Sequence, residues 1–231
     1  MKKIAIIPAR GGSKRIPKKN IKDFLGKPCI AYGIENAINS NLFDEVMVST
    51  DDPEIATIAK KYHAKVPKLR SSKNSSDKAT TTDVLLEVLS MYENKGIHFD
   101  YGCCIYPTTP LLTTQKLLEG FNLIKNKKMD IVISAVKFSH PIQRAFSINS
   151  KKNIQLQFTK NEFKRTQDFL DFYHDAGQFY WFNKNKFIEN KNLFKGNVGA
   201  VILDNIETQD IDTIDDWELA KLKYNKLKND V

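Results

Sequence analysis

The chain has 231 residues, of which 41% are hydrophobic and 27% are charged, the balance of a globular and not of a disordered protein. A chain of this length can bury a sizeable core as one domain, so it needs neither disulfides nor a structural metal to fold. The 36 Lys and Arg residues outnumber the 27 Asp and Glu residues and give a formal net charge of +9. This surplus indicates an anionic partner: nucleic acid, an acidic membrane or a phosphate-bearing small molecule.

The apolar runs and the cysteines bear on the cellular compartment. No apolar run is long enough to cross a bilayer. The stretch 4–9 is also too short for the apolar part of a signal peptide, and a buried strand is the better interpretation. The three cysteines, Cys29, Cys103 and Cys104, have the spacing of neither a disulfide framework nor a zinc site. We therefore expect core thiols and a cytoplasmic protein.

Predicted strands and helices alternate along the chain. Short apolar runs without a period indicate strands buried on both faces, and apolar residues recurring every three or four positions indicate helices. Repeated βα units of this kind favour a largely parallel sheet covered by helices. In chain order, the pattern predicts a strand at 3–8, a helix at 28–39, a strand at 44–49, helices at 53–62 and 82–93, a strand at 101–106, a helix at 115–125, strands at 131–136, 178–182 and 198–203, and a helix at 217–226.

The βα pattern is interrupted at approximately 138–173, where the chain becomes polar and rich in lysine. Within this stretch, 146–148 and 154–158 are predicted to pair as a hairpin around 149–153. The stretch has too few apolar residues to form its own core. The sequence thus predicts a single domain over residues 1–231, with an inserted β-arm in place of a second globular domain.

The strongest motif follows the first predicted strand, at the edge where an α/β sheet binds its ligands. Residues 6–20 read IIPARGGSKRIPKKN. Gly11 and Gly12 allow the backbone to approach a phosphate closely, and five cations surround them: Arg10, Lys14, Arg15, Lys18 and Lys19. The motif lacks the spacing of a Walker A loop. It also lacks the glycine spacing of a dinucleotide fingerprint, and this second absence disfavours a dehydrogenase. A solvated basic loop or a localisation signal is the alternative interpretation.

A loop this basic suits a nucleoside triphosphate and the chemistry of nucleotidyl transfer. A nucleophile attacks the α-phosphate, pyrophosphate leaves, and the transition state needs cations on both groups. Mg²⁺ usually supplies part of this charge and needs carboxylate ligands. Asp210 and Asp212 flank Ile211 in an extended segment, so their side chains point the same way. Two interpretations remain open for this pair: a Mg²⁺ site, or an acidic turn that caps the helix after it.

Two further segments carry polar groups that could contact a ligand. Arg70, with Asp77 and the threonines at 80–82 beyond it, could read the edge of a pyrimidine ring, although a loop and a helix cap would look the same. The segment 174–178, HDAGQ, precedes the aromatic run FYWF. An aromatic strand is usually core, but polar residues at its start would lie at a strand edge near a pocket.

Taken together, these residues resemble the CMP-sugar synthetases, which are cytidylyltransferases that act on nonulosonic acids such as sialic acid. The resemblance covers nearly the whole chain and is carried by the loop at 6–20, Asp51, the segment 106–111 (YPTTPL) and the Asp210–Asp212 pair. It implies an α/β, three-layer Rossmann-like nucleotidyltransferase fold with a mostly parallel mixed sheet. It also implies an arm that exchanges across a homodimer, CTP as donor and Mg²⁺ as cofactor. We expect no nucleic-acid or membrane partner.

The resemblance also implies roles for individual residues. Lys19, Arg10 and Asp212 would be catalytic, with Lys19 stabilising the departing pyrophosphate and Asp212 helping to deprotonate the sugar. Asp210 and Asp212 would bind the metal. The residues implied to bind the nucleotide are Ala9, Arg10, Gly11, Gly12, Ser13, Lys14, Lys19, Asn20, Arg70, Ala79 and Thr81. Those implied to bind the nine-carbon acidic sugar are Tyr106, Thr108, Arg165, Gln167, His174, Asp175 and Gln178.

The choice of sugar rests on departures from the sialic acid enzymes. Those enzymes carry Gln and Arg where this chain has Tyr106 and Leu112, and Arg-Pro-Asn-Gly-Ala where it has 174–178. The chain most resembles the pseudaminic acid cytidylyltransferases, whose sugar carries extra acylamino groups and whose product serves surface or flagellar glycan synthesis. Legionaminic or sialic acid is the alternative substrate. A nucleic-acid-binding module is a remote alternative, because the basic residues are dispersed and no nucleic-acid-binding motif appears.

Overall fold

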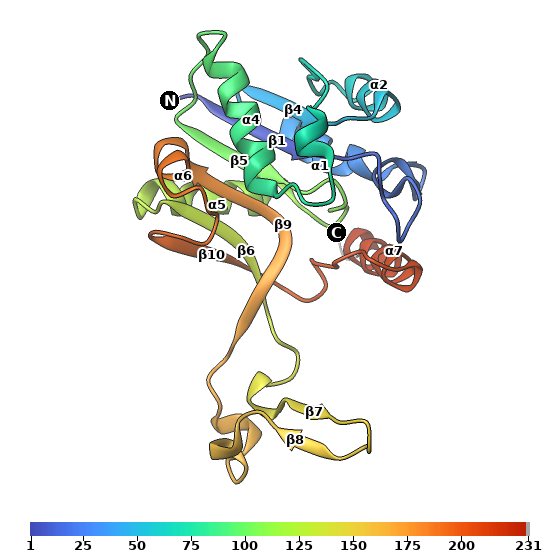
Figure 1. The fold of residues 1–231 in the computed structure, drawn as a ribbon, viewed down its shortest axis with the longest axis vertical. Helices are drawn as coiled ribbons and strands as arrows, with labels where there is room; N and C mark the ends of the chain where they lie inside the picture. The colour runs from blue at the N-terminus through green and yellow to red at the C-terminus, as the bar shows by residue number, and fades with distance from the viewer. Residues whose placement is uncertain (230–231) are drawn as a thin grey trace.

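A six-stranded sheet forms the centre of the computed structural model, which describes residues 1–229 (Figure 1). Its strand order is β10–β6–β9–β5–β1–β4. Five strands are parallel to one another, and β9 runs antiparallel to both of its neighbours, β5 and β6. The strands are β1 (Lys3–Pro8), β4 (Glu45–Ser49), β5 (Tyr101–Ile105), β6 (Ile131–Lys137), β9 (Tyr173–Asn183) and β10 (Val198–Leu203).

Helices cover both faces of the sheet and make a three-layer structure. Ala5 and Ile7 of β1 pack into one hydrophobic cluster, with side chains of α1 (Cys29–Asn39), α2 (Pro53–Lys61) and α5 (Thr114–Asn126). Ile4 and Ile6 pack into a second cluster on the other face, with α4 (Thr81–Glu93) and α6 (Lys184–Asn190). Burial on both faces explains why the β1 sequence shows no alternation. The predicted three-layer α/β architecture with a mostly parallel sheet is confirmed.

A third, smaller cluster joins the segment after β1 to the C-terminal part of the chain. It packs Ile16 and Phe24 against Ile211 and Trp217. Trp217 belongs to α7 (Ile214–Asn229), which lies beside the loop that follows β1 (Figure 1). The short elements of this region are η1 (Lys19–Ile21), β2 (Asp23–Phe24) and β3 (Lys27–Pro28).

Two features of the fold differ from the sequence prediction. Strand β9 starts five residues before the predicted 178, because 173–175 pair with β6 after a register shift between Ile133 and Ala135. Its polar, exposed start gave no strand signal. The four-residue helix α3 (Ser72–Ser75) and the helix α6 were not predicted either. A helix as short as α3 has no apolar face from which a period could be read.

The segment between β6 and β9 projects away from the sheet (Figure 1). It contains η2 (Ile142–Arg144), β7 (Phe146–Ile148), β8 (Ile154–Leu156), η3 (Thr159–Asn161) and η4 (Thr166–Asp168). Strands β7 and β8 pair as the predicted antiparallel hairpin. Within residues 138–172 no side chain is buried, and Phe163 and Leu170 are 94% and 81% exposed. This inserted arm thus contributes nothing to the core.

Candidate nucleotide-binding site

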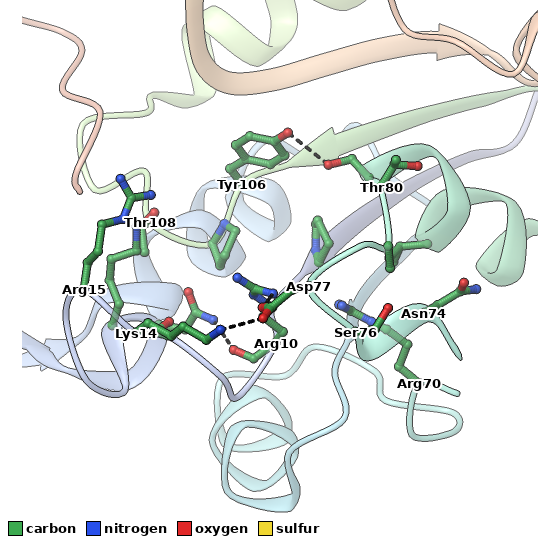
Figure 2. Close-up of a pocket in the computed structure, with 18 of the residues that line it drawn as sticks. Arg10, Lys14, Arg15, Arg70, Asn74, Ser76, Asp77, Thr80, Tyr106 and Thr108 are labelled. Carbon is green, nitrogen blue, oxygen red and sulfur yellow. Dashed lines mark hydrogen bonds and ion pairs between the residues drawn. The ribbon is translucent and has the colours of Figure 1, made fainter. Parts of the chain in front are cut away.

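A cavity of about 530 Å³ lies at the carboxyl ends of β1 and β5, the edge at which the sequence predicted a ligand site (Figure 2). Three segments form its walls: the loop after β1, the stretch that includes α3 and the start of α4, and the loop after β5. Its lining residues are Pro8, Arg10, Ser13, Lys14, Arg15, Ile16, Lys19, Asn20, Arg70, Asn74, Ser76, Asp77, Ala79, Thr80, Thr81, Val84, Tyr106, Pro107 and Thr108.

The loop after β1 is fixed from behind by hydrogen bonds. The buried Asn20 donates from Nδ2 to the carbonyl oxygen of Arg10 at 2.9 Å. The backbone N–H of Gly11 donates to Asp51 Oδ1 at 3.1 Å. A Cβ atom on Gly11 would lie 2.6 Å from Asp52 Oδ2, so no larger residue fits there without movement. The glycine thus serves close packing against the loop after β4, while Ala9 is wholly buried beneath the loop.

Two loop cations are directed at one carboxylate. Arg10 Nη1 lies 2.7 Å from Asp77 Oδ1, and Lys14 Nζ lies 2.6 Å from Asp77 Oδ2 (Figure 2). The hydrogen bonds from Lys14 and Arg10 hold the pKa of Asp77 below its usual value. Arg10 and Lys14 were both predicted to hold the triphosphate. Because the Asp77 carboxylate bridges them, the two side chains are close enough to bind one anion together.

The other loop cations meet the predicted metal ligands. Arg15 Nη1 lies 2.6 Å from Asp212 Oδ2. Lys19 Nζ donates to the carbonyl oxygen of Ile211 at 2.5 Å and lies 3.6 Å from Asp212 Oδ1. Incomplete hydration of the Asp210 carboxyl group, together with the negative charge of Asp212, raises the pKa of Asp210. Asp212 thus pairs with the cationic loop, whereas neither aspartate belongs to the cavity lining.

Arg70 stands on the opposite wall and is held by the end of β4. Its Nε donates to Ser49 Oγ at 3.0 Å, its Nη2 donates to the Ser49 carbonyl, and burial lowers its pKa. The following segment is tied to α4 through Glu87, which accepts bonds from Ser71 N at 2.9 Å and from Ser71 Oγ at 2.7 Å. Asn74 donates to the same carboxylate. Ala79 and Thr81, further along the chain, line the cavity.

The residues predicted to contact the sugar are divided between the cavity and other places. Tyr106 and Thr108 line the cavity, and the Tyr106 hydroxyl lies 3.0 Å from Thr81 Oγ1. Gln178 is instead buried, with its side-chain N–H bonded to the Glu207 carbonyl at 2.6 Å. The structure thus brings Tyr106 and Thr108, but not Gln178, to the cavity.

The remaining predicted sugar residues lie outside the lining. His174 and Asp175 are exposed at the start of β9. Arg165 and Gln167 lie in the arm, where Arg165 pairs with Asp168 at 3.1 Å. Within residues 1–229 of this one chain, neither arm residue lines the cavity.

Sequence reasoning missed several residues of the cavity wall. From the sequence, Arg15 is only one of several loop cations, and Asp77 is only a polar residue beyond Arg70. Asn74 and Ser76 gave no signal of their own, because they belong to the short helix α3 and to the turn after it. The serine and asparagine content around 71–76 is typical of a helix cap, and Ser71 does cap α3.

Comparisons with known proteins identify relatives of the chain. A profile of the cytidylyltransferase family matches residues 4–225. A pseudaminic acid cytidylyltransferase of Campylobacter jejuni is 42% identical over 97% of both chains. A CMP-N,N'-diacetyllegionaminic acid synthase of Legionella pneumophila is 30% identical over 96% of this chain and 95% of its own.

The fold also agrees with a solved structure. A CMP:2-keto-3-deoxy-manno-octonic acid synthetase complexed with CTP superposes with a TM-score of 0.70 at 18% identity, over 99% of this chain and 100% of the other. At that identity the likeness concerns the fold alone, and it agrees with the predicted nucleotidyltransferase fold. With the family profile covering nearly its whole length, the chain belongs to the cytidylyltransferase family.

Proposed function

We propose that the protein transfers CMP from CTP to the anomeric hydroxyl of pseudaminic acid, releases pyrophosphate and forms CMP-pseudaminic acid for surface or flagellar glycans. The observation that carries this proposal is the 42% identity to the Campylobacter jejuni enzyme over 97% of both chains. A cavity walled by loop cations at the carboxyl edge of the sheet supports it, because a triphosphate needs such a site.

The reaction needs no covalent intermediate with the enzyme. The anomeric oxygen attacks the α-phosphorus of CTP, the bond from that phosphorus to the bridging oxygen breaks, and pyrophosphate leaves with the electron pair. Arg10, Lys14 and Ser13 bind the triphosphate, and Lys19 neutralises the charge that develops on the pyrophosphate. The hydroxyl proton passes to Asp212, whose carboxylate lies 3.6 Å from the Lys19 ammonium group.

The base is read by the opposite wall of the cavity. Arg70 uses Nε and Nη2 to bind Ser49, which holds the guanidinium in place and leaves other N–H donors for the ring edge of cytosine. Ala79 and Thr81 supply backbone groups and a hydroxyl from the start of α4. Asn20, which lines the cavity below Arg10, contacts the ribose.

Asp210 and Asp212 have the chemistry of a Mg²⁺ site. Burial and the negative charge of Asp212 together raise the pKa of Asp210, and a bound dication would favour the ionised form of this carboxyl group. Among residues 1–229, no group of three or more His, Cys, Asp or Glu residues could hold a metal. Two carboxylates suffice for Mg²⁺, because it commonly takes one or two and completes its shell with phosphates and water. When bound, Mg²⁺ would neutralise phosphate charge in the transition state.

We also propose that the protein works as a homodimer in the cytoplasm. The arm exposes large apolar side chains, among them Ile148, Ile154, Phe163 and Leu170, in a segment that has no core of its own. Exchange of the arm with a second copy would cover these side chains. It would also bring Arg165 and Gln167 to the sugar end of the other copy's cavity.

Among residues 1–229, no helix combines the length and apolarity needed to span a membrane.

A coupled assay of pyrophosphate release tests the proposal. We expect release only when CTP, Mg²⁺ and pseudaminic acid are present together, and slower release with legionaminic or N-acetylneuraminic acid at equal concentration. Faster turnover of one of those two sugars would keep the chemistry and reject pseudaminic acid as the substrate. No release with any of the three sugars would reject the proposal.

A further inference from the structure

Tyr180 makes a hydrogen bond that an ordinary strand would not allow. Its side chain is only 2% exposed, yet its hydroxyl donates to Oδ2 of the exposed Asp175 at 2.6 Å. Five residues of a regular strand span about 17 Å and point to opposite faces at their two ends. The two side chains meet because β9 bends at Gly177, which has a φ of +62°, where the pairing with β6 shifts register.

Both oxygens of Asp175 are held in place by this bend. Oδ2 accepts the bond from Tyr180, and Oδ1 accepts a bond from the backbone N–H of Gly177 at 2.9 Å. Each carboxylate oxygen can accept a second hydrogen bond. The side chain is exposed, so these free positions can reach a ligand. Asp175 is thus an acceptor whose orientation is fixed before any ligand binds.

The bend lies against the wall of the nucleotide cavity. The rings of Tyr180 and Tyr106 pack with centroids 5.3 Å apart, and a Cβ atom on Gly177 would lie 4.0 Å from Tyr106 Cδ2. Tyr106 lines the cavity, and its hydroxyl lies 3.0 Å from Thr81 Oγ1. The two tyrosines therefore connect Asp175 with the segment that carries the proposed contacts to the base.

We propose that Tyr180 is a positioning residue that orients Asp175 toward a hydroxyl or acylamino N–H donor of the sugar. This inference rests on the proposed function. The buried hydroxyl of Tyr180 is already used by Asp175 and does not itself touch the substrate. A sugar with acylamino groups offers N–H donors, and a fixed, charged acceptor at the edge of the cavity favours such a sugar over one that lacks them.

The test measures steady-state kinetics of Tyr180→Phe, Asp175→Asn and the double variant. Tyr180→Phe is expected to raise the KM for the sugar roughly tenfold, as loss of one hydrogen bond to a charged group would, and to leave the Kd of CTP unchanged. If Tyr180 acts through Asp175, the double variant will be no worse than Asp175→Asn alone. Tyr101→Phe is the matched control, because Tyr101 lies at the amino end of β5, the end away from the cavity.

Three results would overturn the inference. The first is an unchanged KM for the sugar in Tyr180→Phe. The second is a defect in the double variant equal to the product of the two single defects, because Tyr180 would then act independently of Asp175. The third is an equal rise in the KM of the sugar and the Kd of CTP for Tyr180→Phe with a lowered melting temperature, which would indicate a structural role only. Failure of the proposed function is distinguishable from all three, because it would appear as a lack of turnover by the unmodified protein.

Discussion

Lys19 offers the sharpest test of the proposed chemistry. The substitution Lys19→Ala removes an ammonium group that is 20% exposed, donates to the Ile211 carbonyl and lies 3.6 Å from Asp212. Asp212 keeps its ion pair with Arg15 at 2.6 Å, so the variant retains a partner for that carboxylate. We therefore expect it to fold and to bind CTP, with its defect confined to the chemical step.

The size of the defect follows from the distance and the exposure. A unit charge on the departing pyrophosphate, held as far from the Lys19 ammonium group as Asp212 is, would interact with it by about 5 kcal/mol at the effective dielectric constant of about 20 that suits a partly exposed site. The other loop cations share the pyrophosphate charge, so we expect a loss of about 3 to 4 kcal/mol of transition-state stabilisation. That loss corresponds to a kcat roughly 100- to 1000-fold lower.

The assay combines pyrophosphate release under saturating substrates with CTP binding measured by calorimetry. Lys18→Ala is the matched control, because the neighbouring Lys18 is 64% exposed and pairs with Glu54, outside the cavity lining. The control should keep kcat within about twofold, since exposed ion pairs contribute little. A weaker CTP affinity with an unchanged kcat for Lys19→Ala would refute the reasoning, because it would show that Lys19 binds ground and transition states equally.

Three further substitutions test other parts of the structure. Asp77→Asn should tighten CTP binding several-fold in titrations at low salt, because the two loop cations lose the carboxylate that competes with phosphate; weaker binding would mean that Asp77 holds the cations in place. At pH values above the raised pKa of Asp210, ionisation of this carboxyl group opposes folding, so Asp210→Asn should raise the melting temperature of the metal-free protein. At lower pH the substitution should have little effect on the melting temperature. A melting temperature that does not depend on pH in this way would show that the folded structure does not raise the pKa of Asp210. Gly102→Ala should lower the free energy of unfolding in urea by about 1 to 3 kcal/mol, because the new Cβ would lie 2.2 Å from Phe182 Cζ in a packed core; unchanged stability would show that this ring moves freely.

Much of the fold could be predicted because its signals are local. The apolar run at 3–8 predicted β1, since its side chains alternate between two buried clusters. The start of β9 could not be predicted in the same way. Residues 173–175 are polar and exposed, and only their pairing with β6 across the bend at Gly177 makes them part of a strand. Helix α3 likewise depends on the hydrogen bonds to Glu87.

The cationic half of the candidate site was accessible from the sequence for the same reason. Its glycines and basic residues are contiguous, and they follow a recognisable strand. The partners of those residues are distant: Asp77 follows Arg10 by 67 residues, and Asp212 follows Arg15 by 197. No local pattern links such pairs. The hydrogen bond between Tyr180 and Asp175 escaped prediction because it requires a bend inside the strand.

The cluster formed by Ile16, Phe24, Ile211 and Trp217 has a consequence for how the protein acquires activity. Contacts between residues near position 20 and residues beyond 210 have a very high sequence separation, and such contacts form late in folding. During synthesis, the basic loop is made early, and nearly the whole chain must follow before Asp212 is available to pair with it. A chain that stopped before α7 could still pair its six strands, but it would lack Trp217 and with it part of the apolar support that holds Asp212 opposite Lys19.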